Sequence, residues 1–182
     1  MVESDEEIID SYVKGDIESF NRLYNRHKDD LFRFCCFMMK DVSKAEDILQ
    51  KAFIRFFENA GKLSQKTEGT FKPWMFSVVA NLCKDEFKRA ETKRTQSLEN
   101  PDYHLSKFVH HEQGLENEEL SSKIDKAIDQ LPEKLRQVIG LQYYAELDLK
   151  EISKVLKIPE GTVKSRLFKA KEGLARMLRG LR

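Results

Sequence analysis

The segment of residues 148–171, DLKEISKVLKIPEGTVKSRLFKAK, constrains the fold more than any other part of the chain. Asp148 and Glu151 have the spacing of a capping box, in which each side chain accepts a hydrogen bond from the other residue's backbone amide, so a helix is expected to begin here. Pro159 cannot continue that helix, but it suits the first turn of a second one because proline has no amide hydrogen to leave unpaired. With a turn at residues 157–158, the pattern predicts a helix-turn-helix unit.

The second helix of this unit is expected to bury one face and expose the others. Its apolar residues recur at intervals of four, three and four, as in a helix face packed on a core: Val163, Leu167, Ala170 and Leu174. The residues of the outer faces are free to contact DNA: Thr162, Lys164, Ser165, Phe168, Lys169 and Lys171. In the turn, Lys157 stands where glycine is common, so this residue is expected to adopt a strained backbone conformation.

Charge is distributed unevenly along the chain. Residues 149–182 contain ten Lys or Arg and three Glu, whereas residues 1–30 contain nine acidic and four basic residues, so the net charge of +1 hides a dipolar molecule. A basic end favours nucleic acid because phosphate binding releases condensed counterions. A basic helix alone is as often merely solvated, but joined to a capped helix-turn-helix pattern it predicts DNA binding.

The composition indicates a mainly helical chain. Charged residues make up 35% of the chain, with only 8 Gly and 4 Pro, which is typical of helical proteins. A length of 182 residues is enough for two small domains. No apolar run approaches the roughly 20 residues of a membrane span, and no signal peptide is evident, so a cytoplasmic chain without membrane insertion is expected. The odd number of cysteines argues against a disulfide framework, and we interpret Cys35, Cys36 and Cys83 as small core residues.

Helical patterns fill most of the chain outside one gap. Capping patterns predict helices that begin near residues 5, 17 and 44, the last from Ser43 and Glu46. A loop is expected at 61–70, and Pro73 is expected to open a fourth helix. Periodicity fades at 95–117, which indicates a flexible linker, and two more helices precede the helix-turn-helix unit. The predicted fold class is all-α, with two small helical domains at 1–94 and 118–182.

Four segments resemble a known protein family in their order and spacing. They are SKAEDILQKAFIRFF (43–57), FKPWMFSVVANLCKDEFKR (71–89), LPEKLRQVIGLQYY (131–144) and EGTVKSRLFKAK (160–171). Together they resemble the extracytoplasmic-function (ECF) class of bacterial sigma factors over nearly the whole chain outside the linker. The resemblance implies an alternative sigma factor that directs core RNA polymerase to promoters, with a region 2-like domain followed by a region 4-like domain. It also implies an anti-sigma factor as a partner.

The resemblance assigns the helix near 45–57 to polymerase docking. In the family this helix docks on the clamp helices of the largest polymerase subunit, which makes Asp47, Gln50 and Lys51 the expected polar contacts. Ordinary core packing on the opposite side of the same helix is compatible with this role, because neighbouring positions of a helix point in different directions.

The segment 71–89 resembles the region that binds and opens the minus-ten promoter element. Opened bases must be held, and stacking or hydrogen bonding supplies about 1 to 3 kcal/mol per base. Asn81 matches the family residue that reads a flipped base, and Lys84, Lys88 and Arg89 are expected to follow the phosphates of the strand.

Trp74 is a further minus-ten candidate with a competing structural role. It matches a tryptophan that acts at the melting edge in larger sigma factors, where a second tryptophan follows. Met75 stands in that second position here, which weakens a wedge role. We expect Trp74 to be packed, because an aromatic residue at helical spacing usually belongs to a core.

The second helix of the helix-turn-helix unit matches the helix that recognises the minus-thirty-five element in the family. The matching readers are Lys164, Ser165, Phe168 and Lys169, whereas Thr162, Arg166 and Lys171 suit phosphate contacts. Family members often carry arginine at the lysine positions, and lysine lacks the bidentate fork that reads guanine. Recognition of DNA shape and phosphates is therefore expected to weigh more than direct readout.

Two other functions compete with the sigma factor hypothesis. A DNA-binding regulator that does not join polymerase explains the carboxy-terminal half but leaves 45–57 and 71–89 without a role. A metal site at His104, His110 and His111 with the cysteines lacks Cys-x-x-Cys and His-Glu-x-x-His spacing, so we expect no metal and no cofactor. Neither a phosphate-binding loop nor a nucleophile with its base is present, so the chain is not expected to be an enzyme.

Overall fold

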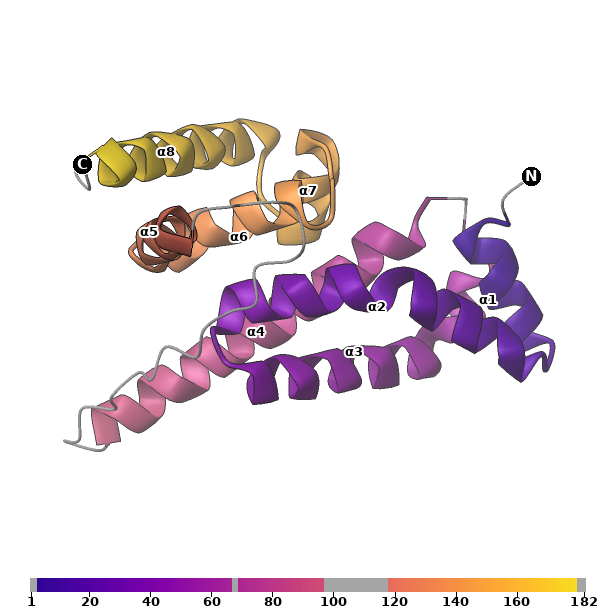
Figure 1. Cartoon of the computed structure of the whole chain (residues 1–182). Coiled ribbons are helices and arrows are strands. Elements are labelled where there is room, and N and C mark those ends of the chain that lie inside the picture. The colour runs from indigo at the N-terminus through magenta and orange to yellow at the C-terminus, as the bar shows by residue number, and fades with distance from the viewer. Residues whose placement is uncertain (1–2, 67–68, 97–117, 180–182) are drawn as a thin grey trace.

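The structure, a computed structural model, describes residues 3–66, 69–96 and 118–179. These residues form helices joined by short connections and include no strand (Figure 1). The helices are α1 (Asp5–Val13), α2 (Ile17–Met39), α3 (Val42–Leu63), α4 (Phe71–Gln96), α5 (Glu118–Asp129), α6 (Glu133–Tyr143), α7 (Leu149–Leu156) and α8 (Glu160–Arg179). The prediction of an all-α fold is confirmed, and all but the first two residues of the predicted linker lie outside the described ranges.

The first two helices begin where the capping patterns predict. Ser4 caps α1, with its hydroxyl accepting a hydrogen bond from the amide of Glu7 at 3.2 Å. The Glu7 carboxylate in turn accepts from the amide of Ser4 at 2.7 Å, which completes the capping box. Asp16 caps α2 through a 3.1 Å hydrogen bond from the amide of Glu18.

The third helix begins close to the predicted residue 44, but its predicted cap at Ser43 is wrong. Its cap is Asp41, whose Oδ1 accepts a hydrogen bond from the amide of Lys44 at 3.1 Å, so α3 begins at Val42 rather than after Ser43. A carboxylate caps a helix as well as a hydroxyl does, and Asp41 comes first along the chain.

The loop predicted at 61–70 is shorter than expected. Helix α3 continues through Leu63, so the first residues of that range are helical. Helix α4 begins at Phe71, and Pro73 therefore lies within its first turn rather than at its first position. Proline is tolerated there because the first amides of a helix have no intrahelical partner.

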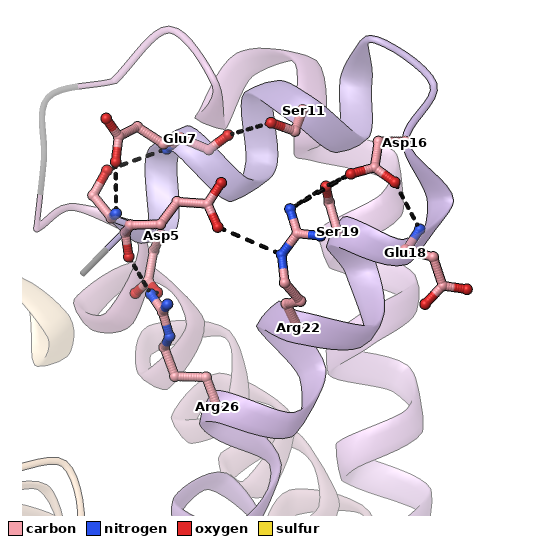
Figure 2. A network of polar contacts seen from close by, with 10 residues as sticks. Asp5, Glu7, Ser11, Asp16, Glu18, Ser19, Arg22 and Arg26 are labelled. Carbon is pink, nitrogen blue, oxygen red and sulfur yellow. Dashed lines mark hydrogen bonds and ion pairs between the residues drawn. The ribbon is translucent and has the colours of Figure 1, made fainter. Parts of the chain in front are cut away.

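A polar network holds α1 against the first half of α2 (Figure 2). Arg26 Nη1 lies 2.8 Å from Asp5 Oδ1, and His27 Nε2 lies 2.9 Å from the other Asp5 oxygen. Nearer the start of α2, Arg22 donates to the Ser19 hydroxyl at 2.9 Å and pairs with Glu3, just before α1, at 3.4 Å. Burial raises the pKa of Asp5, but the hydrogen bonds and charges of His27 and Arg26 outweigh it, so the pKa of this carboxyl is lowered.

One apolar core runs through both halves of the molecule. Phe34 and Phe37 of α2 belong to the same cluster of buried residues as Val138 and Leu141 of α6. Helix α6 packs against α2, and helix α7 packs against α4. The carboxy-terminal helices therefore lie directly on the amino-terminal bundle.

The three cysteines are buried in the amino-terminal bundle, which confirms their interpretation as core residues. Burial raises the pKa of Cys36 to about 11. A hydrogen bond with Cys83, together with burial, raises the pKa of Cys35 well above its ordinary value. Both thiols stay protonated at neutral pH, a state in which cysteine is a poor nucleophile and metal ligand.

We expect Asp5→Asn to lower the free energy of unfolding by about 1 to 3 kcal/mol at pH 7, because it removes the carboxylate that contacts Arg26 and His27. Because the pKa of Asp5 is lowered in the folded state, this carboxylate stabilises the fold at pH values above its unfolded pKa near 3.8. That stabilisation is lost as the pH falls through the folded-state pKa. Urea unfolding from pH 7 to pH 3 should show the deficit shrinking in acid. The matched control is Asp29→Asn on an exposed position of α2, and an equal deficit at every pH would contradict the assignment.

Candidate nucleic-acid interface

The helix-turn-helix unit has the predicted capping and turn. The amide of Glu151 donates to Asp148 Oδ1 at 2.8 Å, and the amide of Asp148 donates to Glu151 Oε2 at 2.9 Å. Helix α7 ends before Lys157, which has a left-handed backbone with φ of 54°, so the expected strain is present at this residue. The Ser153 hydroxyl donates to the carbonyl of Ile158 at 2.6 Å and ties the turn to α7.

Helix α8 separates a buried face from a basic outer face. Val163, Leu167 and Ala170 are buried, as their spacing predicts. The outer residues Lys164, Ser165, Lys169 and Lys171 are exposed, and Thr162 and Arg166 are half-buried. Phe168 lies among these cations with 69% of its surface exposed. The sequence therefore predicted correctly which side of α8 is exposed, although Leu174, also predicted to face inward, is only half-buried.

Helix α4 exposes the amide and the amines that were predicted to contact the minus-ten strand. Asn81, Lys84, Lys88 and Arg89 are all exposed. The first three recur at intervals of three and four residues, which places them on one side of the helix. Arg89 Nη1 lies 3.7 Å from Glu86 Oε2 on the same helix, so this guanidinium forms an ion pair with an acidic neighbour.

Trp74 has two environments. Its ring is half-buried and packs against the apolar core, with its centroid 6.3 Å from that of Phe71. It also lines a cleft of about 270 Å³ between the start of α4 and helix α7. Ser77 stands on the same wall as Trp74, and Glu151 and Lys154 form the wall that faces them.

Glu6 determines where α4 begins, although the sequence offered no sign of this role. Its buried carboxylate accepts hydrogen bonds from the amides of Thr70 and Phe71, each at 2.9 Å, and from the amide of Gly69 at 3.2 Å. A side chain of α1 thus satisfies the unpaired amides at the start of α4. Sequence patterns reveal caps only within a few residues, and this one acts across more than sixty residues.

The outer face of α3 combines the predicted polar residues with an apolar groove. Asp47, Gln50 and Lys51 are exposed, and Lys51 pairs with Asp47 at 3.8 Å. Beside them Ile54 is 55% exposed and Phe57 is 45% exposed. The groove of about 320 Å³ is lined by Tyr24, Leu49, Gln50, Phe53, Ile54 and Phe57. The sequence analysis did not single out Ile54 and Phe57 as site residues. The available signal was that both are apolar yet lie outside the apolar stripe that packs inward.

Neither a metal centre nor a membrane span is found in the described ranges. No group of three or more His, Cys, Asp or Glu side chains within 3–66, 69–96 and 118–179 could hold a metal ion. His104, His110 and His111 lie outside these ranges. None of the helices described above is long and apolar enough to cross a membrane.

Comparison with known proteins identifies both halves of the chain. Residues 23–93 match the family model of Sigma-70 region 2, and residues 121–174 match that of Sigma-70 region 4. The ECF RNA polymerase sigma factor SigW of Bacillus subtilis is 35% identical over 176 residues, which cover 92% of this chain and 93% of SigW. The chain belongs to the ECF sigma factors. It is therefore an alternative sigma factor, a transcription initiation factor that directs RNA polymerase.

Further relatives agree with this family and fold. The RNA polymerase sigma-H factor of Pseudomonas aeruginosa is 24% identical, with 98% of this chain and 96% of the relative covered. The solved structure of the sigma factor RpoE in complex with the anti-sigma factor NepR from Bartonella quintana has a TM-score of 0.70 at 17% identity. That match covers 90% of this chain and 98% of RpoE, and it supports the all-α fold of this sigma factor.

We expect Glu6→Gln to lower the melting temperature by about 3 to 8 °C, because three amides would lose a charged acceptor worth about 1 to 3 kcal/mol. Hydrogen exchange at the amides of Gly69, Thr70 and Phe71 should accelerate more than exchange in the rest of α4. Glu58→Gln, at an exposed position of α3, is the matched control and should change neither quantity. Unchanged exchange at these three amides in Glu6→Gln would show that the carboxylate does not hold the start of α4.

Proposed function

We propose that this sigma factor bridges core polymerase and promoter DNA through three separate surfaces. In this proposal residues 1–94 form the region 2 domain, residues 118–182 form the region 4 domain, and 95–117 is the linker. The domain of residues 1–94 docks on the polymerase and holds the opened minus-ten strand, while the other domain anchors the minus-thirty-five duplex. The observation that carries the proposal is that α3, α4 and α8 expose three chemically different faces.

The outer face of α8 suits duplex DNA. Lys164, Ser165 and Lys169 can reach base edges or phosphates from a helix lying in the major groove, and Phe168 offers an apolar surface to a thymine methyl group or a sugar. An aromatic ring that is 69% exposed on a lysine-rich helix face contributes little to the core, which supports a role in binding. We assign Thr162, Arg166 and Lys171 to phosphate contacts.

The exposed side of α4 suits a single strand. The Asn81 amide can both donate to and accept from the edge of an unpaired base, and Lys84 and Lys88 can follow the adjacent phosphates. We place Arg89 at the end of this track. Trp74 lies at the opposite end of the same helix, where its exposed edge would meet a base at the border of the opened region.

The outer face of α3 suits a protein partner. An exposed apolar groove with a polar rim is the usual composition of a protein interface. We propose that Ile54 and Phe57 enter the contact with the clamp helices of the largest polymerase subunit, with Asp47, Gln50 and Lys51 at its rim.

The remaining assignments follow from this role. Polymerase supplies the chemistry of RNA synthesis, so we infer that the sigma factor has no catalytic activity of its own and needs no cofactor. Its place of action is the cytoplasm, at the nucleoid when it is bound to polymerase. Because RpoE is solved in complex with the anti-sigma factor NepR, we also propose an anti-sigma partner for this chain.

Run-off transcription with core polymerase and a library of promoters tests the proposed function. We expect specific initiation from a subset of promoters, and tight promoter binding only when core polymerase is present. A regulator that never joins polymerase would instead bind duplex promoter DNA with the same affinity in the presence and absence of core polymerase. Absence of specific initiation from every promoter would contradict the proposal.

Two lysines of α8 should differ in their effect on specificity. We expect Lys164→Ala to weaken initiation at one class of promoter, because this residue reaches base edges. Lys171→Ala should weaken all promoters about equally and reduce the salt dependence of binding by about one phosphate contact. Binding to a panel of promoters at several salt concentrations measures both effects, and equal losses on all sequences for Lys164→Ala would refute the assignment.

The groove of α3 should be needed for polymerase binding. We expect Ile54→Asp to weaken binding to core polymerase at least about tenfold, because it places an unpaired charge in an apolar contact. Val42→Asp, an exposed position at the start of the same helix, is the control and should bind normally. Equal affinities of the two variants in a titration with labelled core polymerase would remove the groove from the docking surface.

A further inference from the structure

Glu6 of α1 is buried although it carries a charge, and its partners all belong to the start of another helix. Its carboxylate accepts hydrogen bonds from the three amides of residues 69–71 at 2.9 to 3.2 Å. The next bond along the chain runs from the amide of Trp74 to the carbonyl of Thr70 at 3.2 Å and closes the first turn of α4. Glu6 therefore holds the amides that precede the helix's own hydrogen bonds.

A second acid of α1, Asp5, bears on the same turn through a histidine of α2. Asp5 belongs to the polar network of Figure 2, and its Oδ2 lies 2.9 Å from His27 Nε2. The His27 ring meets the Phe71 ring edge-on, with 5.2 Å between centroids, and both rings are buried. The first residue of α4 is thus held at its backbone by Glu6 and at its ring by His27.

The position of Phe71 determines that of Trp74. The two residues are three apart in one helix, which places them on the same side, and their ring centroids lie 6.3 Å apart. The Trp74 ring is half-buried and also lines the cleft at the start of α4. Such a ring keeps one orientation only while the turn beneath it is intact.

We propose that Glu6 and Asp5 are positioning residues for promoter opening, which act through Phe71 on the ring of Trp74. The inference rests on the proposed function, in which the edge of Trp74 meets a base at the border of the opened region. A ring that is already fixed can take the place of a stacked base pair without first being ordered. The two carboxylates therefore speed the opening of the promoter, whereas α8 supplies the binding of its duplex.

The alternative is that the two acids only stabilise the fold. Loss of either carboxylate would then lower the amount of folded sigma factor and reduce every activity by the same factor. A positioning role predicts a selective loss instead. Opening of a duplex promoter should slow, while initiation from a promoter that needs no opening should stay the same.

The fluorescence of 2-aminopurine, placed at the upstream border of the opened segment, measures opening by the assembled holoenzyme. The duplex is a promoter that gives run-off transcripts with wild type. We expect Glu6→Gln and Asp5→Asn each to slow opening about threefold or more, because a mobile ring must be ordered during the step. A copy of the promoter with mismatched bases across the opened segment should be transcribed at the wild-type rate by both variants. Either variant serves should the other fail to fold.

Ala45→Gly is the control for a general loss of stability. Ala45 is buried near the start of α3, about 27 Å along that helix from the end that leads to α4. The substitution weakens a helix and removes a buried methyl group, so it should lower the melting temperature to a similar extent. We expect it to open the duplex promoter at the wild-type rate.

The free protein offers a readout that needs no promoter. Trp74 is the one tryptophan of the chain, so the intrinsic tryptophan fluorescence reports on this ring alone. We expect acrylamide to quench the fluorescence of Glu6→Gln more strongly than that of wild type or Ala45→Gly. Unchanged quenching in Glu6→Gln would show that Glu6 does not hold the ring, whatever the protein does on a promoter.

A double variant tests whether Glu6 acts through Trp74. Trp74→Leu should slow opening by itself, and adding Glu6→Gln should slow it no further. Losses that multiply in the double variant, or wild-type opening by Trp74→Leu, would overturn the positioning role. So would equal slowing of Glu6→Gln on the duplex and the mismatched promoter. Failure of wild type to initiate at any promoter would instead refute the proposed function itself.

Discussion

The burial of the aromatic face of α2 is the constraint on which the rest of the structure depends. This helix packs against α1, α3, α4 and α6. Phe34 and Phe37 are buried on it, and the ring centroid of Phe34 lies 5.6 Å from that of Phe76 on α4. Burying one such ring contributes about 1.5 to 3 kcal/mol, so the packing around α2 is a large share of what holds a small helical protein together. Because α3 and α4 turn their apolar sides toward α2, their polar residues face outward.

The three outer faces differ in chemistry in a way that suits one initiation factor. The face of α3 is an apolar groove with a polar rim, that of α4 carries an amide followed by cations, and that of α8 is basic with an exposed ring at Phe168. Compositions of these three kinds suit a protein, an unpaired strand and a duplex in turn, which is why we propose those roles for α3, α4 and α8. Helix α6 also packs against α2, so one core joins the two halves of the chain.

Short sequence patterns predicted the features that depend on residues close together in the chain. The capping box at Asp148, the left-handed turn at Lys157 and the exposed side of α8 all depend on residues a few positions apart, and all are present as expected. The capping pattern at Ser43 predicts a cap for α3, but Asp41, two residues earlier, is the cap that forms. Local patterns cannot reveal the Glu6 cap of α4 or the close approach of Gly140 on α6 to the Phe34 ring of α2, because those contacts join residues far apart in the sequence. The roles of Asn81 and Lys164 came from resemblance to the family and stay predictions.

The proposed contacts of α4 and α8 with promoter DNA are the centre of the function proposed for this sigma factor. Alkylation of Asn81→Cys in α4 and Phe168→Cys in α8 tests these contacts most directly, because both positions are exposed and the native cysteines are buried. Both introduced cysteines should react in the free protein and be protected once core polymerase and promoter DNA are bound. Equal reaction rates in the two states at both positions would contradict the proposed contacts.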